Sequence, residues 1–379
     1  MDKENASHFV IEDTKQVLLE KTPDKISMEV TSEEHVENSE IRESESSVTG
    51  KGPSIENASL RNRSNANTLK DNMSLMRYSA RSSLAGAILL RMKHDEMHRN
   101  SNHSYWYKVN LKRIPEHMHK KFYCLHQDEE TKEFLEGCYE KADWIFTQIF
   151  YSLFRSVLSW FMTNTSINAY LNRGSMFVYS QAHFMKLLGL KETTVFENLI
   201  DLGAGDGMVT KKMASYFKNV YVTEVSNQMK IRLKEKGFIN LALDRWANGD
   251  IIYDVVTCLN LLDRCNEPLT ILKQIKGVLR PGSGILIIAL VFPFSPYVEE
   301  NSVDHTSAEK LDIKGSGFEE QLVSFVDNVL EPLGYELITF SRAPYISEGD
   351  ISTSFYVIDD AIFILKLTDN TTEYCNNDK

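Results

Sequence analysis

A glycine-rich stretch, "DLGAGDG" at residues 201–207, has the composition of a ligand-binding turn. It follows an apolar run and precedes a helix-like segment, and its three glycines let the backbone turn tightly and approach a ligand closely. A dinucleotide site needs the spacing G-x-G-x-x-G, but the third glycine is replaced by Met208, which argues against NAD. Asp206 inside the turn disfavours a pyrophosphate and favours a cationic ligand.

Two further acidic residues flank this turn. Asp201 closes the apolar run before it, and Glu224 in "VYVTEVS" follows at about the 20-residue distance where doubly wound folds place an acceptor for ribose hydroxyls. A single strand-end glutamate is often merely solvated, but in combination with the turn the ribose role is favoured. S-Adenosylmethionine has a sulfonium, an ammonium and a ribose, so the pattern fits this cofactor. Trp246 either walls the adenine or belongs to the core.

A third polar group lies in "CLNLLDRC" at residues 258–265. Asn260 and Asp263 are three residues apart and follow the fourth predicted strand. Taken without regard to fold, they are the cap region of a helix that begins near residue 268. In a doubly wound fold, however, this position lies at the carboxyl ends of the strands, where ligands bind. We therefore expect both side chains to face the reacting group.

Alternating apolar strands and helices must position these residues. The predicted strands span 198–202, 219–223, 239–243, 254–259, 284–291, 335–341 and 356–366, and the helices 207–217, 226–236, 268–279 and 318–332. Strands separated by helices predict a mostly parallel sheet covered on both faces. The last two strands have no helix between them, which predicts an antiparallel pair. The expected fold is α/β: a class I, Rossmann-like methyltransferase with a seven-stranded sheet, an antiparallel edge strand and an N-terminal helical segment.

The chain before this region divides by composition. Residues 1 to about 60 contain 14 acidic against 6 basic residues and no tryptophan, which predicts disorder. Residues 74–92 predict a basic amphipathic helix packed on its own domain, and residues 129–162 a buried helix. We expect a disordered extension over 1–75, a helical segment over 76–195 that caps the catalytic domain, the Rossmann-like domain over 196–369, and a disordered tail over 370–379.

Charge and cysteine content exclude several classes of protein. A formal net charge of −11 argues against a nucleic-acid partner. Five cysteines without a C-x-x-C pair indicate neither a zinc ribbon nor a disulfide framework. The histidine pair in "HDEMH" at 94–98 has helical spacing but no fixed third ligand, so we expect no metal. No apolar run is long enough for a membrane span, and we expect a soluble, cytoplasmic monomer.

Several motifs together resemble the DREV family of methyltransferase-like proteins, whose members methylate histidine side chains in proteins. They are "RGSMFVYS", "DLGAGDG", "VTEVS", "CLNLLDRCNEPLT", "PYISEGD" and "YVIDDAIFILK", in order between about residues 137 and 367. The resemblance implies S-adenosylmethionine as cofactor and protein-histidine N-methyltransferase activity. It further implies Nδ1 (pros) methylation in His-x-His segments of protein substrates where x is small.

The resemblance also implies roles for individual residues. It implies cofactor binding by Asp201, Gly203, Gly205, Glu224, Asn260, Arg173, Gly174 and Ser175. Asn260 and Asp263 would be catalytic, and Asp263, Tyr345 and Tyr356 would bind the substrate. We hypothesise that Asp263 accepts the Nε2 proton of the acceptor imidazole. Two alternatives stay open: the same fold acting on a small amine or another protein side chain, and a methyltransferase fold retained as a binding module without catalysis.

Overall fold

The computed structural model describes residues 84–158, 171, 174–298 and 305–368. The predicted extension over 1–75, the tail over 370–379 and the first part of the predicted helix at 74–92 lie outside the described residues. Arg173, which the resemblance assigns to the cofactor, also lies outside them.

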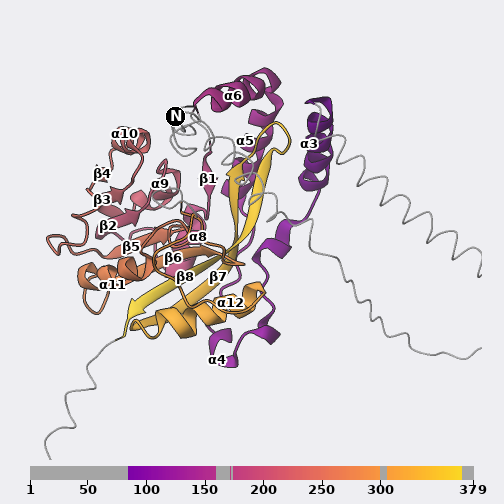
Figure 1. The fold of residues 1–379 in the computed structure, drawn as a ribbon. Helices are drawn as coiled ribbons and strands as arrows, with labels where there is room; N and C mark the ends of the chain where they lie inside the picture. Colours follow the sequence, from indigo (N-terminus) through magenta and orange to yellow (C-terminus); the bar gives the residue numbers. More distant parts are fainter. Residues whose placement is uncertain (1–83, 159–170, 172–173, 299–304, 369–379) are drawn as a thin grey trace, which may run out of the picture.

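An eight-stranded sheet in the order β1-β7-β8-β6-β5-β2-β3-β4 forms the centre of the molecule (Figure 1). The strands are β1 (Met176–Phe177), β2 (Phe196–Leu202), β3 (Phe217–Thr223), β4 (Ile239–Asn240), β5 (Val255–Leu259), β6 (Ile285–Val291), β7 (Tyr335–Glu348) and β8 (Phe355–Leu367). Strands β2 to β6 run parallel, and β8 runs antiparallel to both β6 and β7. This is the strand order of a Rossmann-like methyltransferase.

The sheet differs from the expected one in two details. An eighth strand, β1, adds two residues that pair antiparallel with Ser347 and Ile346 of β7. The antiparallel strand β8 does not form an edge, because it is inserted between β6 and β7. Its apolar run suits an interior place, since a strand covered on both faces has no polar side to present to water; Ile362 and Phe363, on opposite faces, are both fully buried.

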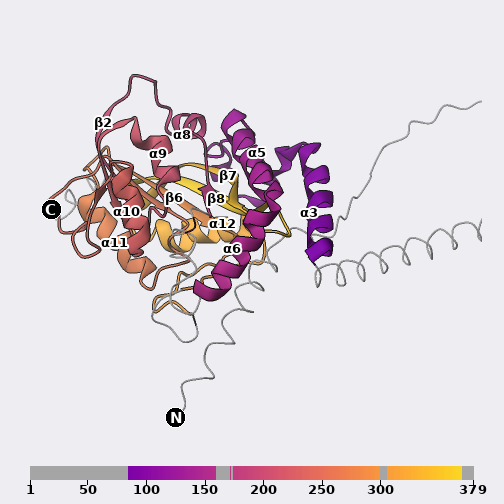
Figure 2. The same cartoon turned by 90° about the horizontal axis from the view of Figure 1, so that it is seen from above.

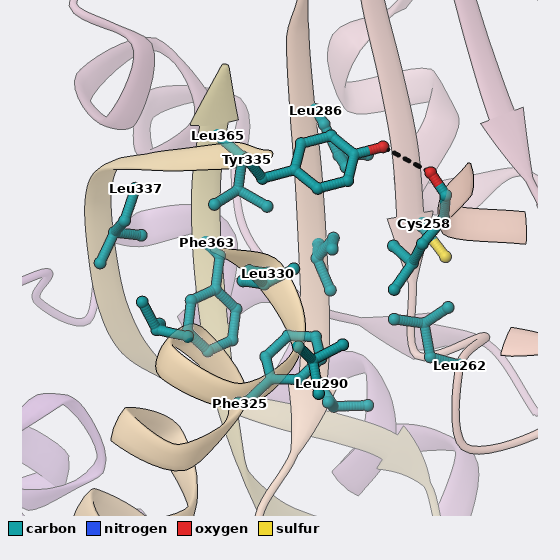
Figure 3. Close-up of a cluster of buried hydrophobic side chains, with 14 of the residues drawn as sticks. Cys258, Leu262, Leu286, Leu290, Phe325, Leu330, Tyr335, Leu337, Phe363 and Leu365 are labelled. Atoms are coloured by element: carbon teal, nitrogen blue, oxygen red, sulfur yellow. Dashed lines mark hydrogen bonds between the residues drawn. The ribbon is translucent and has the colours of Figure 1, made fainter. Parts of the chain in front are cut away.

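Two hydrophobic clusters cover the two faces of the sheet. Successive residues of a strand point to opposite faces, and so Val255 lies in one cluster and Val256 in the other. Figure 3 shows part of the cluster that contains Val256, where Phe325 and Phe363 lie among leucines from β6 and β8. The buried hydroxyl of Tyr335 donates a hydrogen bond to the Leu272 carbonyl at 2.7 Å, which satisfies the one polar atom of that ring.

Helices connect the strands much as predicted. They are α8 (Gln181–Leu188), α9 (Met208–Ala214), α10 (Asn227–Glu235), α11 (Pro268–Val278) and α12 (Phe318–Phe325). The predicted helix at 318–332 is α12 followed by a π-helical turn, η4 (Val326–Leu330). Seen from above, α10 and α11 lie on one side of the molecule and the N-terminal helices α3 and α5 on the other (Figure 2).

The N-terminal part forms α3 (Leu84–Arg99), two short 3₁₀ helices η2 (His103–Tyr107) and η3 (Leu111–Arg113), α4 (Glu116–His119), α5 (Glu129–Asp143) and α6 (Ile145–Leu158). Helix α3 packs on its own domain, because its buried Arg91 donates hydrogen bonds to the Ala142 carbonyl and to Asp143. No described helix is long and apolar enough to cross a membrane.

The prediction of one buried helix over 129–162 is wrong around residues 144–150. The backbone of Trp144 leaves the helical region, at φ −78° and ψ 69°, and separates α5 from α6. Phe146 is 89% exposed and Trp144 62% exposed. An apolar segment predicts burial only if neighbouring elements cover it, and α6 begins a new direction at the rim of the domain (Figure 1). Residues 159–162 lie outside the described part.

Candidate cofactor and acceptor site

The glycine-rich turn joins β2 to α9 at the carboxyl ends of the parallel strands. Gly203, Gly205 and Gly207 have φ angles of 70°, 57° and 74°, a region that side chains disfavour. A Cβ at Gly207 would lie 2.6 Å from Leu233, so close packing requires glycine there. A Cβ at Gly205 would meet no heavy atom within 4 Å. The middle of the turn therefore faces open space, as a turn that receives a ligand must.

Glu224 lies directly against this turn. Its carboxylate accepts hydrogen bonds from the Gly205 N–H at 2.9 Å and from the N–H groups of Val225 and Ser226 at 2.8 and 3.0 Å. The residue is 9% exposed. Glu224 therefore joins the end of β3 to the glycine turn, and it stands where an acceptor for ribose hydroxyls was predicted.

Asp201 lies beneath the turn at the end of β2. It is 2% exposed, and it accepts hydrogen bonds from the hydroxyls of Thr210 at 2.6 Å and Thr257 at 2.7 Å. Burial raises the pKa of Asp201 to about 6 and the charge of Glu224 adds to this, although the two hydroxyls oppose it. The carboxyl thereby links α9 and β5 to the strand that leads into the turn.

The segment before β1 closes over the same turn. The Ser175 hydroxyl donates to Asp206 at 2.9 Å, and the Gly174 N–H donates to Glu348 of β7 at 3.1 Å. The Glu348 N–H in turn donates to the Ser175 carbonyl at 3.1 Å. The structure thus brings two of the three residues assigned to this cover next to the glycine turn.

Asn260 and Asp263 follow β5, as the sequence predicts. Asn260 has a φ of 54°, which is uncommon for a residue other than glycine. Its Nδ2 donates to Asp360 at 2.9 Å, whereas its buried Oδ1 has no hydrogen-bond partner among the described residues. Asp263 is 2% exposed, and its carboxylate lies 3.2 Å from Arg264 Nε. A buried carboxylate paired with an exposed arginine and an unpaired acceptor thus lie within one short loop.

The two tyrosines come from the β7–β8 hairpin. Tyr345 is paired with Ile358, and Tyr356 lies two residues from Ile358 on β8, so both rings project from the same face of the hairpin. The Tyr345 hydroxyl contacts the Met176 sulfur and the Tyr356 hydroxyl donates to Asp350 at 3.1 Å. Burial raises the pKa of both phenols, so both stay protonated at neutral pH. Tyr345 interacts electrostatically with Asp263.

The structure also places Trp246 and the histidine pair at 94–98. Trp246 is 6% exposed and belongs to the hydrophobic core, where the Tyr253 hydroxyl contacts its carbonyl, so its core interpretation is the one supported. The rings of His94 and His98 lie 4.3 Å apart between centroids, tilted by 41°. No group of three or more histidine, cysteine or acidic side chains within residues 84–158, 174–298 and 305–368 is arranged to hold a metal.

Sequence reasoning missed Asp360, the partner of Asn260. It stands in the middle of β8 and is fully buried. Burial, together with the nearby charge of Asp263, raises its pKa to about 8. The available signal was a carboxyl group within the apolar run "YVIDDAIFILK", because an interior strand rarely holds an acid without a specific partner.

These features suit S-adenosylmethionine. The space beside Gly205, where a Cβ would meet no heavy atom within 4 Å, leaves room for its amino-acid end. The carboxylate of Glu224 lies against the same turn, where the sequence predicts an acceptor for the ribose hydroxyls. The acidic side chains around the turn complement its two positive charges. Bound there, it would supply an electrophilic methyl group.

Two of the solved structures that this chain resembles are methyltransferases of low sequence identity. An N-methyltransferase, NodS from Bradyrhizobium japonicum WM9 with S-adenosylhomocysteine, is 14% identical, with 49% of this chain and 86% of that chain covered and a TM-score of 0.33. An S-adenosylmethionine-dependent methyltransferase from Clostridium acetobutylicum is 14% identical, with 61% and 99% covered and a TM-score of 0.33.

The family comparison covers the whole site. The model of the DREV methyltransferases matches residues 106–367, which include the glycine turn, the loop after β5 and both strands of the β7–β8 hairpin. Together with the strand order, this match shows that the chain belongs to the DREV methyltransferase family and uses S-adenosylmethionine as its cofactor.

Proposed function

We propose that the protein transfers the methyl group of S-adenosylmethionine to Nδ1 (pros) of histidine in His-x-His segments of other proteins. The observation that favours this acceptor is the loop after β5. There the buried carboxylate of Asp263 follows Asn260 by three residues, at the carboxyl ends of the strands. The side-chain Oδ1 of Asn260 has no hydrogen-bond partner among the described residues.

Cofactor binding is assigned to the glycine turn and its neighbours. Glu224 would accept hydrogen bonds from the ribose hydroxyls with the lone pairs that its backbone contacts leave unused. Gly203 and Gly205 keep side-chain bulk out of the space for the amino-acid end, and Gly174 and Ser175 cover it from the N-terminal side. The bound sulfonium makes its methyl carbon electrophilic, and the residues described next align the acceptor.

The acceptor imidazole must present a bare Nδ1 to the methyl group. A neutral imidazole is largely available at pH 7, because its unperturbed pKa is about 6.5. The remaining requirement is the correct tautomer, with the proton on Nε2. We assign Asp263 to accept a hydrogen bond from that N–H, which fixes the tautomer and stabilises the positive charge that develops on the ring. With the cofactor bound, Nδ1 would form its N–CH₃ bond as S-adenosylhomocysteine leaves with the electron pair of the broken S–CH₃ bond. The methylated ring would then lose its Nε2 proton to solvent and return to neutrality.

The titratable side chains favour histidine over an alkyl amine. A lysine acceptor is protonated at pH 7 and needs a base to expose its lone pair. Among the described side chains of this site, Tyr345 stays protonated and Asp263 is paired with Arg264. An acceptor that is already neutral at pH 7 fits such a site better. Tyr345 and Tyr356 would contact the two imidazoles of the His-x-His segment.

The test incubates purified protein with S-adenosylmethionine labelled on the methyl group and a peptide that contains His-Ala-His. The matched peptide has alanine in place of both histidines, and amino-acid analysis separates the pros from the tele product. Label recovered as pros-methylhistidine from the first peptide only is the expected result. Cofactor binding without label in either peptide would reject the proposed acceptor and leave the fold and the cofactor unaffected.

A further inference from the structure

Asp360 occupies an unusual place for an acidic residue. It lies in β8, between Val291 of β6 and Ala343 of β7, and none of its surface is exposed. A carboxyl group in such surroundings is unfavourable unless it is hydrogen-bonded or uncharged. The apolar packing of the strand therefore does not explain why an acidic residue is present there.

One oxygen of Asp360 meets Asn260. Oδ2 accepts a hydrogen bond from Asn260 Nδ2 at 2.9 Å, and the Ala361 N–H contributes a second contact to the carboxyl. Oδ1 of Asp360 and Oδ1 of Asn260 are both buried without a hydrogen-bond partner among the described residues. In this contact Asn260 donates from Nδ2, which leaves its Oδ1 as the available end of the carboxamide. The Asn260 backbone has a φ of 54°.

Asp360 is surrounded by groups that disfavour a second negative charge. The titratable and charged residues that interact with it are Asp263 from the loop after β5, Tyr345 from β7, Tyr179 after β1, and Asp359 from its own strand. Of these, Asp263 is paired with Arg264 and Asp359 with Arg342, and both tyrosines have a raised pKa. Burial is the largest cause of the raised pKa of Asp360, followed among the charges by Asp263.

We propose that Asp360 is a positioning residue for the transfer reaction: as an uncharged carboxyl group it holds the Asn260 carboxamide so that Oδ1 faces the acceptor imidazole. This inference rests on the function proposed above. It gives the acceptor site one negative charge, that of Asp263, to match the single positive charge that develops on the ring. A second carboxylate would instead favour the imidazolium form, in which Nδ1 is protonated and cannot attack.

The proposal predicts a particular pH profile. Turnover rises through about pH 6.5 as the acceptor imidazole becomes neutral. It then falls as Asp360 ionises, since the pKa of its carboxyl is about 8 and the uncharged form is the one present below that pH. The carboxamide of Asp360→Asn has no such ionisation and still accepts the Asn260 N–H, so this variant should lose the falling limb while its turnover at pH 7 stays within roughly threefold of wild type.

Two further variants separate positioning from a purely structural role. Asp360→Leu fills the space but cannot accept the Asn260 N–H, so we expect turnover to drop roughly tenfold to hundredfold with unchanged affinity for S-adenosylhomocysteine. Asp359→Asn removes the neighbouring carboxyl, which faces the other side of the sheet and pairs with Arg342. This variant should keep the falling limb, moved to slightly lower pH because the charge of Asp359 contributes to the raised pKa of Asp360.

The experiment measures turnover on the His-Ala-His peptide between pH 6 and 9.5 for the wild type and the three variants, with S-adenosylhomocysteine affinity by calorimetry. A ¹³C-carboxyl NMR titration, assigned by the signal absent from Asp360→Asn, follows the ionisation of Asp360 without any acceptor. A midpoint near pH 8 and loss of the falling limb in Asp360→Asn alone support the proposal. A falling limb that persists in Asp360→Asn, or an Asp360 already ionised at pH 6, overturns it. No label on the peptide from wild-type protein refutes the proposed function instead.

Discussion

Alanine substitutions at two glycines of the same turn should have opposite consequences. Both Gly205 and Gly207 have positive φ, at 57° and 74°, and alanine in this conformation costs roughly 1 to 2 kcal/mol. At Gly207 the new Cβ would also lie 2.6 Å from Leu233 and 3.0 Å from Phe238. Such overpacking adds roughly 1 to 3 kcal/mol, so Gly207→Ala should lower the free energy of unfolding by roughly 2 to 5 kcal/mol and Gly205→Ala by only 1 to 2.

For cofactor affinity the order should be reversed, with the larger effect at Gly205. The Cβ at Gly205 meets no protein atom within 4 Å, and we assign that space to the amino-acid end of the cofactor. Gly205→Ala should therefore weaken binding of S-adenosylhomocysteine at least tenfold, which corresponds to about 1.4 kcal/mol. Urea unfolding and titration calorimetry on the same preparations measure the two quantities, and Gly207→Ala is the matched control.

Either measurement can refute the reasoning. If Gly205→Ala binds S-adenosylhomocysteine as tightly as the wild type, the open space beside Gly205 does not receive the cofactor. If Gly207→Ala unfolds at the same urea concentration as Gly205→Ala, Leu233 moves aside without cost, and the packing argument for the third glycine is wrong.

Three further predictions concern the acidic residues. Asp263→Asn should lower turnover on the His-Ala-His peptide roughly 10²-fold and leave S-adenosylhomocysteine affinity unchanged; wild-type turnover would exclude Asp263 as the residue that fixes the tautomer. Glu224→Gln presents an N–H₂ group to backbone donors that now bind a carboxylate, so unfolding should become easier by roughly 1 to 3 kcal/mol and cofactor binding should weaken; urea unfolding and calorimetry detect both. The pKa of Asp201 is raised from 3.8 to about 6, so its stabilising contribution is complete below about pH 4 and declines as pH rises through 6; relative to Asp201→Asn, the wild type should lose about 3 kcal/mol of unfolding free energy over that interval, and parallel curves for the two proteins would contradict this.

The parts of the fold that the sequence predicts well are those with local signals. The apolar runs of β2, β3, β5 and β6 lie within two residues of their predicted bounds, because each is a short buried strand followed by a turn or a cap. The link between Glu224 and the glycine turn was likewise foreseeable, since parallel neighbours bring their carboxyl ends to one edge of the sheet. The structure places Gly205 2.9 Å from that carboxylate.

Features that depend on distant partners had no such signal. Strand β1 is two residues long and exists only because Ser347 and Ile346 of β7 pair with it. The exposure of Phe146 could not be foreseen either, because periodicity identifies an apolar helix but does not identify what covers it. In both cases the missing information is which other element packs against the segment, and the residues of the segment itself do not specify it.

The contact between Asn260 and Asp360 shows how topology determines the chemistry of this site. The residues are 100 positions apart in the sequence. Taken alone, Asn260 resembles an ordinary turn residue, and Asp360 an isolated charged residue in a strand. Because β8 is inserted antiparallel between β6 and β7, Asp360 is paired with Val291 at the carboxyl end of β6. The Asn260 N–H donates to Ala289 of the same strand, so β6 sets the position of both residues. With β8 at the edge of the sheet, β7 would separate the carboxyl from Asn260, and the acceptor site would lose the partner that orients its carboxamide.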